Sequence, residues 1–169
     1  IVFGDWSSDV CSSDLHNLFI GNGEIPTAAQ KGNLKELRWI SSHGLWGYDG
    51  RELPLHAGGN VYCHGALPGA AELKPDVLPE WNPRLRLVED GGRMRLHLTL
   101  DRSLRGAETG LVTTELLGEA KISTLPYVNP DGSKLKIDTD YFGNKRSATR
   151  PVPGPFETTR QGDLNLAVW

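Results

Sequence analysis

Strict alternation of apolar and polar residues is clearest between residues 84 and 100. Residues 84–88 and 94–100 alternate, and the intervening segment 89–92 reads Glu-Asp-Gly-Gly, which suits a tight turn. From Met94 to Leu100 the apolar residues share one face, while Arg95, His97 and Thr99 share the other. The pattern predicts a β-hairpin with one face in water.

Two shorter apolar runs resemble one another. Asn17-Leu-Phe19 aligns with Asn60-Val-Tyr62, and each lies in a run bounded by glycine or asparagine. Stacked coils of a β-solenoid need such repeated runs, and an asparagine at each turn can pair with the asparagine of the next coil. Chance similarity between two unrelated hairpin strands is the alternative.

The rest of the chain predicts further short elements. Residues 111–117 suit a strand or a short helix, while 134–138 and 164–169 suit strands. Residues 40–55 read as a long loop and residues 68–83 as a proline-spaced connector. With 20 glycines and 11 prolines in 169 residues, the composition favours a turn-rich, mainly β domain.

Charge and chemical motifs exclude several classes of protein. The net charge is −3 and basic residues are scattered, so we expect no nucleic-acid partner. Apolar stretches fall short of a membrane span, so we expect no membrane partner. Dinucleotide, phosphate-loop and serine-nucleophile motifs are lacking, and we expect no cofactor. Cys63 reads as a small buried residue; a disulfide with Cys11 is the alternative.

The first fifteen residues are unlike the remainder. Residues 5–15 lack periodicity, contain Ser-Ser-Asp twice, and resemble the in-frame translation of a common sequencing-library adapter. We therefore expect residues 1–15 not to belong to the protein, and the gene to continue upstream of His16. A natural Ser/Asp linker is the alternative, whereas a signal-peptide remnant would need a basic start and an apolar centre.

A pattern near the C-terminus resembles a known class of proteins. Asn129-Pro-Asp-Gly-Ser133 is followed by Asp140-x-x-Gly-x-x-Arg146 and then by Gly154-Pro-Phe156. This resembles the closing segment of bacterial right-handed parallel β-helix proteins, and the likeness extends over most of residues 16–169. It implies the last coils of such a helix over residues 16–75, with a long aromatic loop, and an antiparallel hairpin and β-rich cap over 76–169.

The resemblance also implies a function. Many proteins of this class are carbohydrate-active: glycoside hydrolases of the fucosidase and xylanase type, and polysaccharide lyases. We therefore expect a secreted or periplasmic protein that acts on a polysaccharide or oligosaccharide, as a glycoside hydrolase more than a lyase. Most catalytic residues would lie upstream of His16, and residues 16–169 alone would be inactive.

The aromatic loop is the candidate sugar-binding segment. Trp46, Tyr48, Asp49 and His43 lie close together among glycines; the rings could stack on sugar faces while Asp49 and His43 bind hydroxyls. Alternatively, Trp39 and Trp46 fill the side of the solenoid beneath the loop.

Other chemically capable residues suggest structural roles. Asp131 suits an ordinary turn, and Asp138 and Asp140 suit a salt bridge or backbone capping. The three histidines considered as a metal site have no specific ligand spacing; they are His43, His56 and His64.

Two rivals to the hydrolase remain. One is a non-catalytic carbohydrate-binding or surface-adhesion module, and the other is a purely structural cap. A pair of carboxyl groups about 5–10 Å apart beside the aromatic loop would favour the hydrolase.

Overall fold

A computed structural model describes residues 2–3, 12–23, 55–69, 72–100, 104, 110–120, 123–158 and 161–168. Strands dominate these residues, and the described helix, α3 (Thr114–Leu117), is a single turn. The expectation of a mainly β protein is confirmed. None of the described helices is long and apolar enough to cross a membrane.

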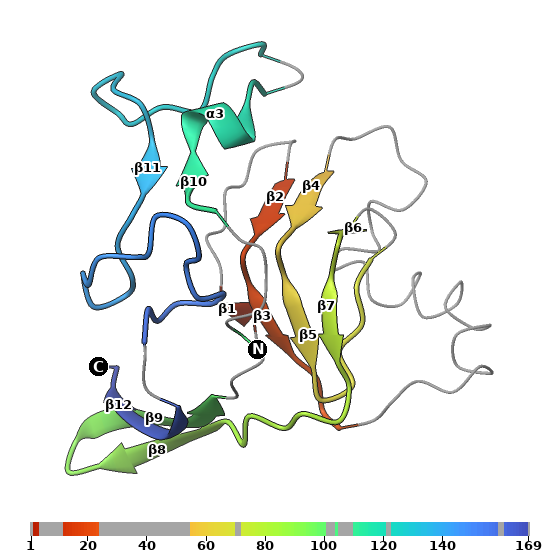
Figure 1. Cartoon of the computed structure of the whole chain (residues 1–169). Helices are drawn as coiled ribbons and strands as arrows, with labels where there is room; N and C mark the ends of the chain where they lie inside the picture. The colour runs from red at the N-terminus through yellow and green to blue at the C-terminus, as the bar shows by residue number, and fades with distance from the viewer. Residues whose placement is uncertain are drawn as a thin grey trace.

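Three strand–bend–strand segments stack in parallel (Figure 1). One sheet contains β2 (Ser12–Leu15), β4 (Leu55–Gly58) and β6 (Glu72–Leu73). The other contains β3 (Leu18–Ile20), β5 (Val61–Cys63) and β7 (Asp76–Leu78), with β1 (Val2–Phe3) antiparallel to β3.

The register of β3 on β5 confirms the alignment made from the sequence. Leu18 lies opposite Val61, and Phe19 lies opposite Tyr62. The rings of Phe19 and Tyr62 are stacked, with centroids 4.8 Å apart and planes 4° from parallel. The two runs are thus successive layers of one stack rather than unrelated hairpin strands.

The bend between the two strands has the same backbone geometry in each layer. His16, Gly59 and Lys74 have φ of 58°, 67° and 53°, the left-handed conformation. Asn17 and Asn60 follow the first two of these bends, and the backbone N–H of Asn17 donates to Oδ1 of Asn60 at 2.7 Å. The asparagine pairing expected from the sequence is therefore present.

In the third layer the carboxylate of Glu72, and not another asparagine, is the partner of Asn60. Nδ2 of Asn60 donates to Oε2 of Glu72 at 2.8 Å, and the hydroxyl of Tyr62 donates to the same oxygen at 2.9 Å. Asn60 is fully buried and Tyr62 almost so. Glu72 satisfies polar groups that would otherwise be costly to bury.

The predicted hairpin is confirmed, as β8 (Arg86–Asp90) and β9 (Arg93–Leu100). Gly91 and Gly92 have φ of 60° and 79°, as a two-residue type I′ turn requires. The predicted C-terminal strand is also present: β12 (Gly162–Ala167) pairs antiparallel with β9, giving the order β12-β9-β8.

The hairpin sheet and the stack share one core. Leu96, Leu98 and Leu100 of β9 pack with Leu18 and Val61 of the stack. Other residues complete this core: Cys63, Leu104, Phe156, Leu164 and Val168. Cys63 is a free, buried thiol, as the sequence indicated, and burial raises its pKa to about 12.

The cap contains little regular structure. Residues 111–117 form both alternatives in turn, β10 (Val112–Thr113) and then α3, whose first turn is capped by the hydroxyl of Thr113. β10 pairs antiparallel with β11 (Lys136–Ile137), within the predicted strand 134–138.

Two strands lie near the boundaries drawn from the sequence. β2 falls within residues 1–15, which the sequence sets apart, and its backbone pairs in parallel with β4. β7 falls just past residue 75, where the coils were expected to end, and pairs in parallel with β5.

Candidate functional site

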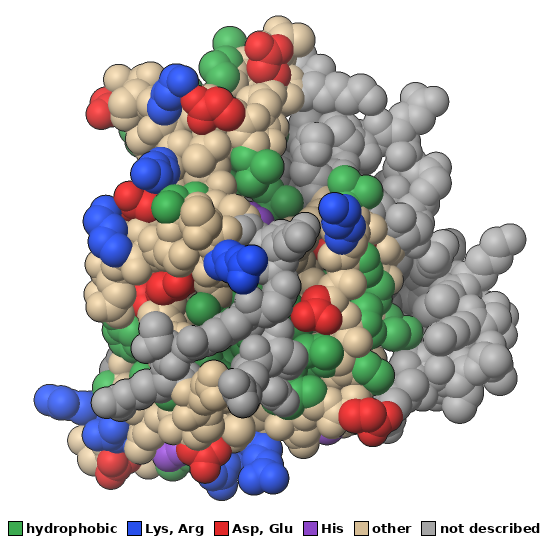
Figure 2. Space-filling view, viewed as in Figure 1, with side chains coloured by type: hydrophobic (Ala, Val, Ile, Leu, Met, Phe, Trp, Pro, Cys, Tyr) green, Lys and Arg blue, Asp and Glu red, His purple; other side chains and the backbone are tan. Residues whose placement is uncertain are grey.

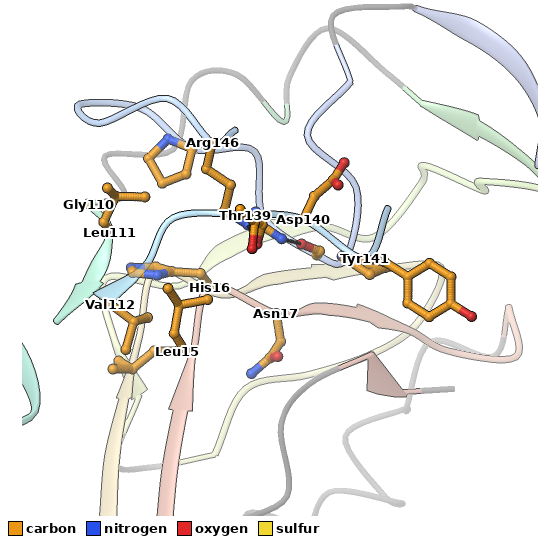
Figure 3. Close-up of a pocket in the computed structure, with 14 residues that line it drawn as sticks. Leu15, His16, Asn17, Gly110, Leu111, Val112, Thr139, Asp140, Tyr141 and Arg146 are labelled. Carbon is orange, nitrogen blue, oxygen red and sulfur yellow. Dashed lines mark hydrogen bonds between the residues drawn. The ribbon is translucent and has the colours of Figure 1, made fainter. Parts of the chain in front are cut away.

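A cavity of about 570 Å³ lies between the first bend of the stack and the cap (Figure 3). The stack contributes Leu15, His16 and Asn17, and the cap contributes residues 110–112 at the start of β10 and residues from β11 onward. The remaining lining residues are Gly110, Leu111, Val112, Ile137, Thr139, Asp140, Tyr141, Arg146, Pro151, Gly154 and Pro155.

His16 supplies the stack's principal polar group to this cavity. Its left-handed backbone is held by two hydrogen bonds: its N–H donates to the carbonyl of Gly58 at 3.1 Å, and Gly154 N–H donates to its carbonyl at 2.7 Å. Burial, with a smaller contribution from the charge of Arg146, lowers the pKa of the imidazole below 6.5. His16 is therefore neutral at pH 7 and can both donate and accept a hydrogen bond.

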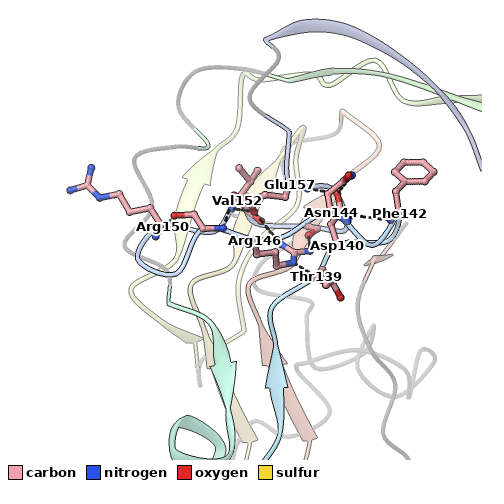
Figure 4. Close-up of polar contacts among 10 residues, drawn as sticks. Thr139, Asp140, Phe142, Asn144, Arg146, Arg150, Val152 and Glu157 are labelled. Atoms are coloured by element: carbon pink, nitrogen blue, oxygen red, sulfur yellow. Dashed lines mark hydrogen bonds and ion pairs between the residues drawn. The ribbon is translucent and has the colours of Figure 1, made fainter.

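Arg146 organises the cap around the cavity (Figure 4). Its guanidinium donates to the carbonyls of Thr139 at 3.1 Å, Val152 at 2.9 Å and Gly154 at 2.7 Å. The carboxylate of Glu157 lies 3.6 Å from Nη1, and both side chains are largely buried. The last residue of the Asp-x-x-Gly-x-x-Arg motif thus joins two backbone segments, at Thr139 and at residues 152–154.

Asp140, the first residue of that motif, caps a turn. Its carboxylate accepts from the N–H groups of Phe142 at 2.9 Å, Asn144 at 2.8 Å and Glu157 at 3.0 Å. Burial acts to raise its pKa, but the hydrogen bond from the side-chain amide of Asn144 and those from the three N–H groups together outweigh burial and lower the pKa. The backbone-capping role predicted for Asp140 is confirmed.

The other two aspartates also match their predicted structural roles. Asp138 pairs with Lys145 at 3.1 Å, the salt bridge expected from the sequence. Asp131 accepts from the N–H of Ser133 at 2.9 Å and from its hydroxyl at 2.6 Å, which is ordinary turn chemistry.

The cavity suits a small neutral ligand with polar and apolar faces. Leu15, Leu111, Val112 and Ile137 supply aliphatic parts of its wall. Its polar side chains are those of His16, Asn17, Thr139, Asp140, Tyr141 and Arg146. Asp140 is the one acid among the lining residues, and both of its oxygens already accept hydrogen bonds, Oδ1 from Phe142 and Asn144 and Oδ2 from Asn144 and Glu157. The lining residues therefore hold no free pair of carboxylates for glycoside hydrolysis.

The residues predicted from the sequence to bind sugar lie outside the described residues. They are Trp46, Tyr48, Asp49 and His43. Among the three histidines considered for a metal, only His64 has a described side chain, and the described residues contain no cluster able to hold a metal ion.

No pattern in the sequence marks His16 and Arg146 as neighbours. Two features involve them: His16 precedes the repeated asparagine, and Arg146 ends the Asp-x-x-Gly-x-x-Arg spacing. Neither feature indicates a cavity, because the two residues are 130 positions apart and meet only through the packing of the cap on the stack.

Charged side chains of both signs are interspersed over the described part of the face in Figure 2. Several Lys or Arg side chains lie along its lower edge, together with acidic ones, where Figure 1 places the β8–β9 hairpin.

Comparison with known proteins gives a likeness of fold. No protein-family model matches the chain, and no curated protein sequence matches it. A solved structure, described as the complex of XylC with xylose, aligns with 93% of this chain at a TM-score of 0.68 and 24% sequence identity. The chain spans 26% of the length of that protein. The chain therefore shares its fold with one part of a larger protein whose structure was solved with a bound sugar.

Proposed function

We propose that this chain is part of a carbohydrate-active protein of the right-handed parallel β-helix class, a glycoside hydrolase acting on a polysaccharide or oligosaccharide. In this proposal the chain supplies terminal coils, the cap and one wall of a saccharide site. Most catalytic residues belong to other coils of the whole protein, which is secreted or periplasmic.

The observation that carries the proposal is the layered stack. Three layers repeat the same bend, and two of them repeat the same asparagine and aromatic positions in register. The likeness of fold to a protein solved with xylose gives the stack a carbohydrate context. Fold alone does not determine chemistry, so the sugar is the part of the proposal that needs a direct test.

The described acids bear on the choice between catalysis and binding. Asp138 and Asp140 are engaged with Lys145 and with backbone N–H groups. This supports a second candidate function, a non-catalytic carbohydrate-binding module, for the part of the chain that the structure describes.

The aromatic loop is the proposed sugar contact in either case. Trp46 and Tyr48 would stack on sugar rings, while Asp49 and His43 would bind hydroxyls. We expect Trp46→Ala to weaken binding of xylotriose to the 169-residue chain about tenfold in a calorimetric titration. Phe142→Ala is the matched control, because Phe142 is a 45% exposed aromatic residue on the cap, and it should leave the affinity unchanged.

Equal affinities of the wild-type chain and Trp46→Ala would exclude the aromatic loop as the contact. Xylotriose binding could instead be retained in Trp46→Ala and lost when a larger side chain is introduced into the cavity beside His16. That result would place the sugar in the cavity.

A further inference from the structure

A second cavity, of about 410 Å³, lies where the stack meets the hairpin. Ile20 and Gly21 at the end of β3 and His64 after β5 form one side. The residues leading into β8 form the other: Asn82, Arg84, Leu85 and Arg86. It shares no lining residue with the cavity beside His16.

The lining is basic. Arg84, Arg86 and His64 line the cavity, and none of its described lining residues is acidic. Within the described part of the chain, neither guanidinium forms an ion pair or a side-chain hydrogen bond. Arg86 lies directly opposite His97 on β9.

The backbone that carries these side chains is fixed. Arg84 has a left-handed φ of 49°, and its N–H donates to Oδ1 of Asn82 at 2.8 Å. The adjoining Pro83 is buried, and its carbonyl accepts from Thr99 of β9 at 2.7 Å. His64 also has a left-handed φ, of 50°, and its carbonyl accepts from Gly23 at 2.8 Å.

We infer that this cavity binds the carboxylate of a uronic acid residue in an acidic saccharide. A guanidinium binds a carboxylate through parallel N–H donors, which makes the two unpaired arginines suited to that group. Ile20 and Leu85 offer an apolar surface to the C–H face of a sugar ring, while His64 and Asn82 offer hydrogen-bonding groups to its hydroxyls.

The two arginines indicate that the ligand carries a negative charge. That this charge belongs to a sugar follows from the proposed function, on which this inference rests. Single-stranded nucleic acid is the less suitable anion, because its binding sites present aromatic rings for stacking and this lining contains none other than the imidazole of His64. The net charge of −3 points the same way.

The test is a calorimetric titration of the 169-residue chain with glucuronate and with glucose, which differ only where the carboxylate replaces the hydroxymethyl group. We expect glucuronate to bind more tightly than glucose and its affinity to fall with added salt. Arg84→Gln combined with Arg86→Gln should weaken glucuronate binding by about tenfold or more, since two charge-assisted contacts are lost.

Arg150→Gln is the matched control, because Arg150 is an exposed arginine outside the lining of this cavity, and it should retain the wild-type affinity. Unfolding midpoints of all variants should agree, which separates lost binding from lost folding. Proton NMR should show the His64 imidazole signals shifting with glucuronate, and His64→Gln should remove those signals.

Three results would overturn the inference. Equal affinity for glucose and glucuronate would show that the carboxylate is not recognised, and inorganic phosphate that binds as tightly as glucuronate would indicate a general anion site. An equal loss in Arg150→Gln would indicate a diffuse charge effect. Xylotriose binding, measured separately, tests the proposed function and is independent of these arginines.

Discussion

At the scale of single residues, close backbone approach determines which positions tolerate a side chain. Gly21 directly follows β3, and a Cβ placed on it would overlap the carbonyl oxygen of His64 and lie 2.5 Å from the nitrogen of Ala66. Both are backbone atoms of the next layer, so no side-chain rotation relieves the overlap. Gly110 has open space at the same test position.

Gly21→Ala should therefore lower the free energy of unfolding by about 1–3 kcal/mol or more, since the two layers must separate to admit the methyl group. Gly110→Ala is the control and should change it little. Urea unfolding followed by circular dichroism measures both. Equal stability of the two variants would contradict the parallel layering of β3 and β5 at this point.

His16 should make the stability depend on pH. Its pKa is lowered in the folded protein, so the folded state resists protonation more than the unfolded state does. The free energy of unfolding should then be unaffected above the unfolded-state pKa of 6.5 and fall as the pH drops below it. His16→Asn, which tolerates the left-handed backbone and does not titrate, should show a smaller fall.

Urea unfolding at about pH 7.5 and about pH 5 measures this difference. Asn165→Gln, at an exposed position of β12 that does not titrate, is the control and should keep the wild-type dependence. An unchanged dependence in His16→Asn would show that the imidazole is not held in the cavity as described.

At the scale of elements, the sequence predicts those structures that arise from local pattern. Alternation from Met94 to Leu100 and the Gly91-Gly92 turn predict the hairpin, and Asn17 aligned with Asn60 predicts the register of β3 on β5. The cap was less predictable, because backbone-to-side-chain hydrogen bonds rather than periodicity hold it. The Asp-x-x-Gly-x-x-Arg spacing was visible, but its partners at Val152, Gly154 and Glu157 were not.

Arg146 should be the most sensitive position in the cap. A lysine ammonium cannot replace the several N–H donors of the Arg146 guanidinium, so Arg146→Lys leaves the buried carbonyls of Thr139 and Val152 and the carboxylate of Glu157 without all of their partners. The substitution should lower the free energy of unfolding by about 2–4 kcal/mol. Lys145→Ala, the neighbouring control, removes an exposed pair with Asp138 and should cost less than about 1 kcal/mol.

Thermal unfolding compares the two variants directly. A loss in Lys145→Ala as large as that in Arg146→Lys would show that general charge balance, rather than the buried guanidinium, holds the cap together.

At the scale of the whole molecule, the two cavities depend on contacts between distant parts of the chain. His16 and Arg146 line one cavity because the cap packs on the stack. His64 and Arg84 line the other because the hairpin packs on the stack. A local sequence pattern does not indicate which distant residues come into contact, and for this reason neither cavity could be predicted from the sequence. The predicted sugar contacts, from His43 to Asp49, lie outside the described residues and stay predictions.

If most catalytic residues lie in other coils of the whole protein, the 169-residue chain alone should not hydrolyse a saccharide. The described lining of the cavity beside His16 has no free carboxylate pair, and the proposal assigns catalysis to other coils. Incubation of the 169-residue chain with xylotriose should release no xylose by chromatography. Measurable release would contradict the assignment of catalysis elsewhere.

Whether this layered stack belongs to a saccharide-binding protein is tested most directly by a calorimetric titration of the wild-type 169-residue chain with xylotriose and with glucuronate. We expect saturable binding of xylotriose, with a separate, salt-sensitive binding of glucuronate. A correctly folded chain that binds neither saccharide would show that the stack does not belong to such a protein.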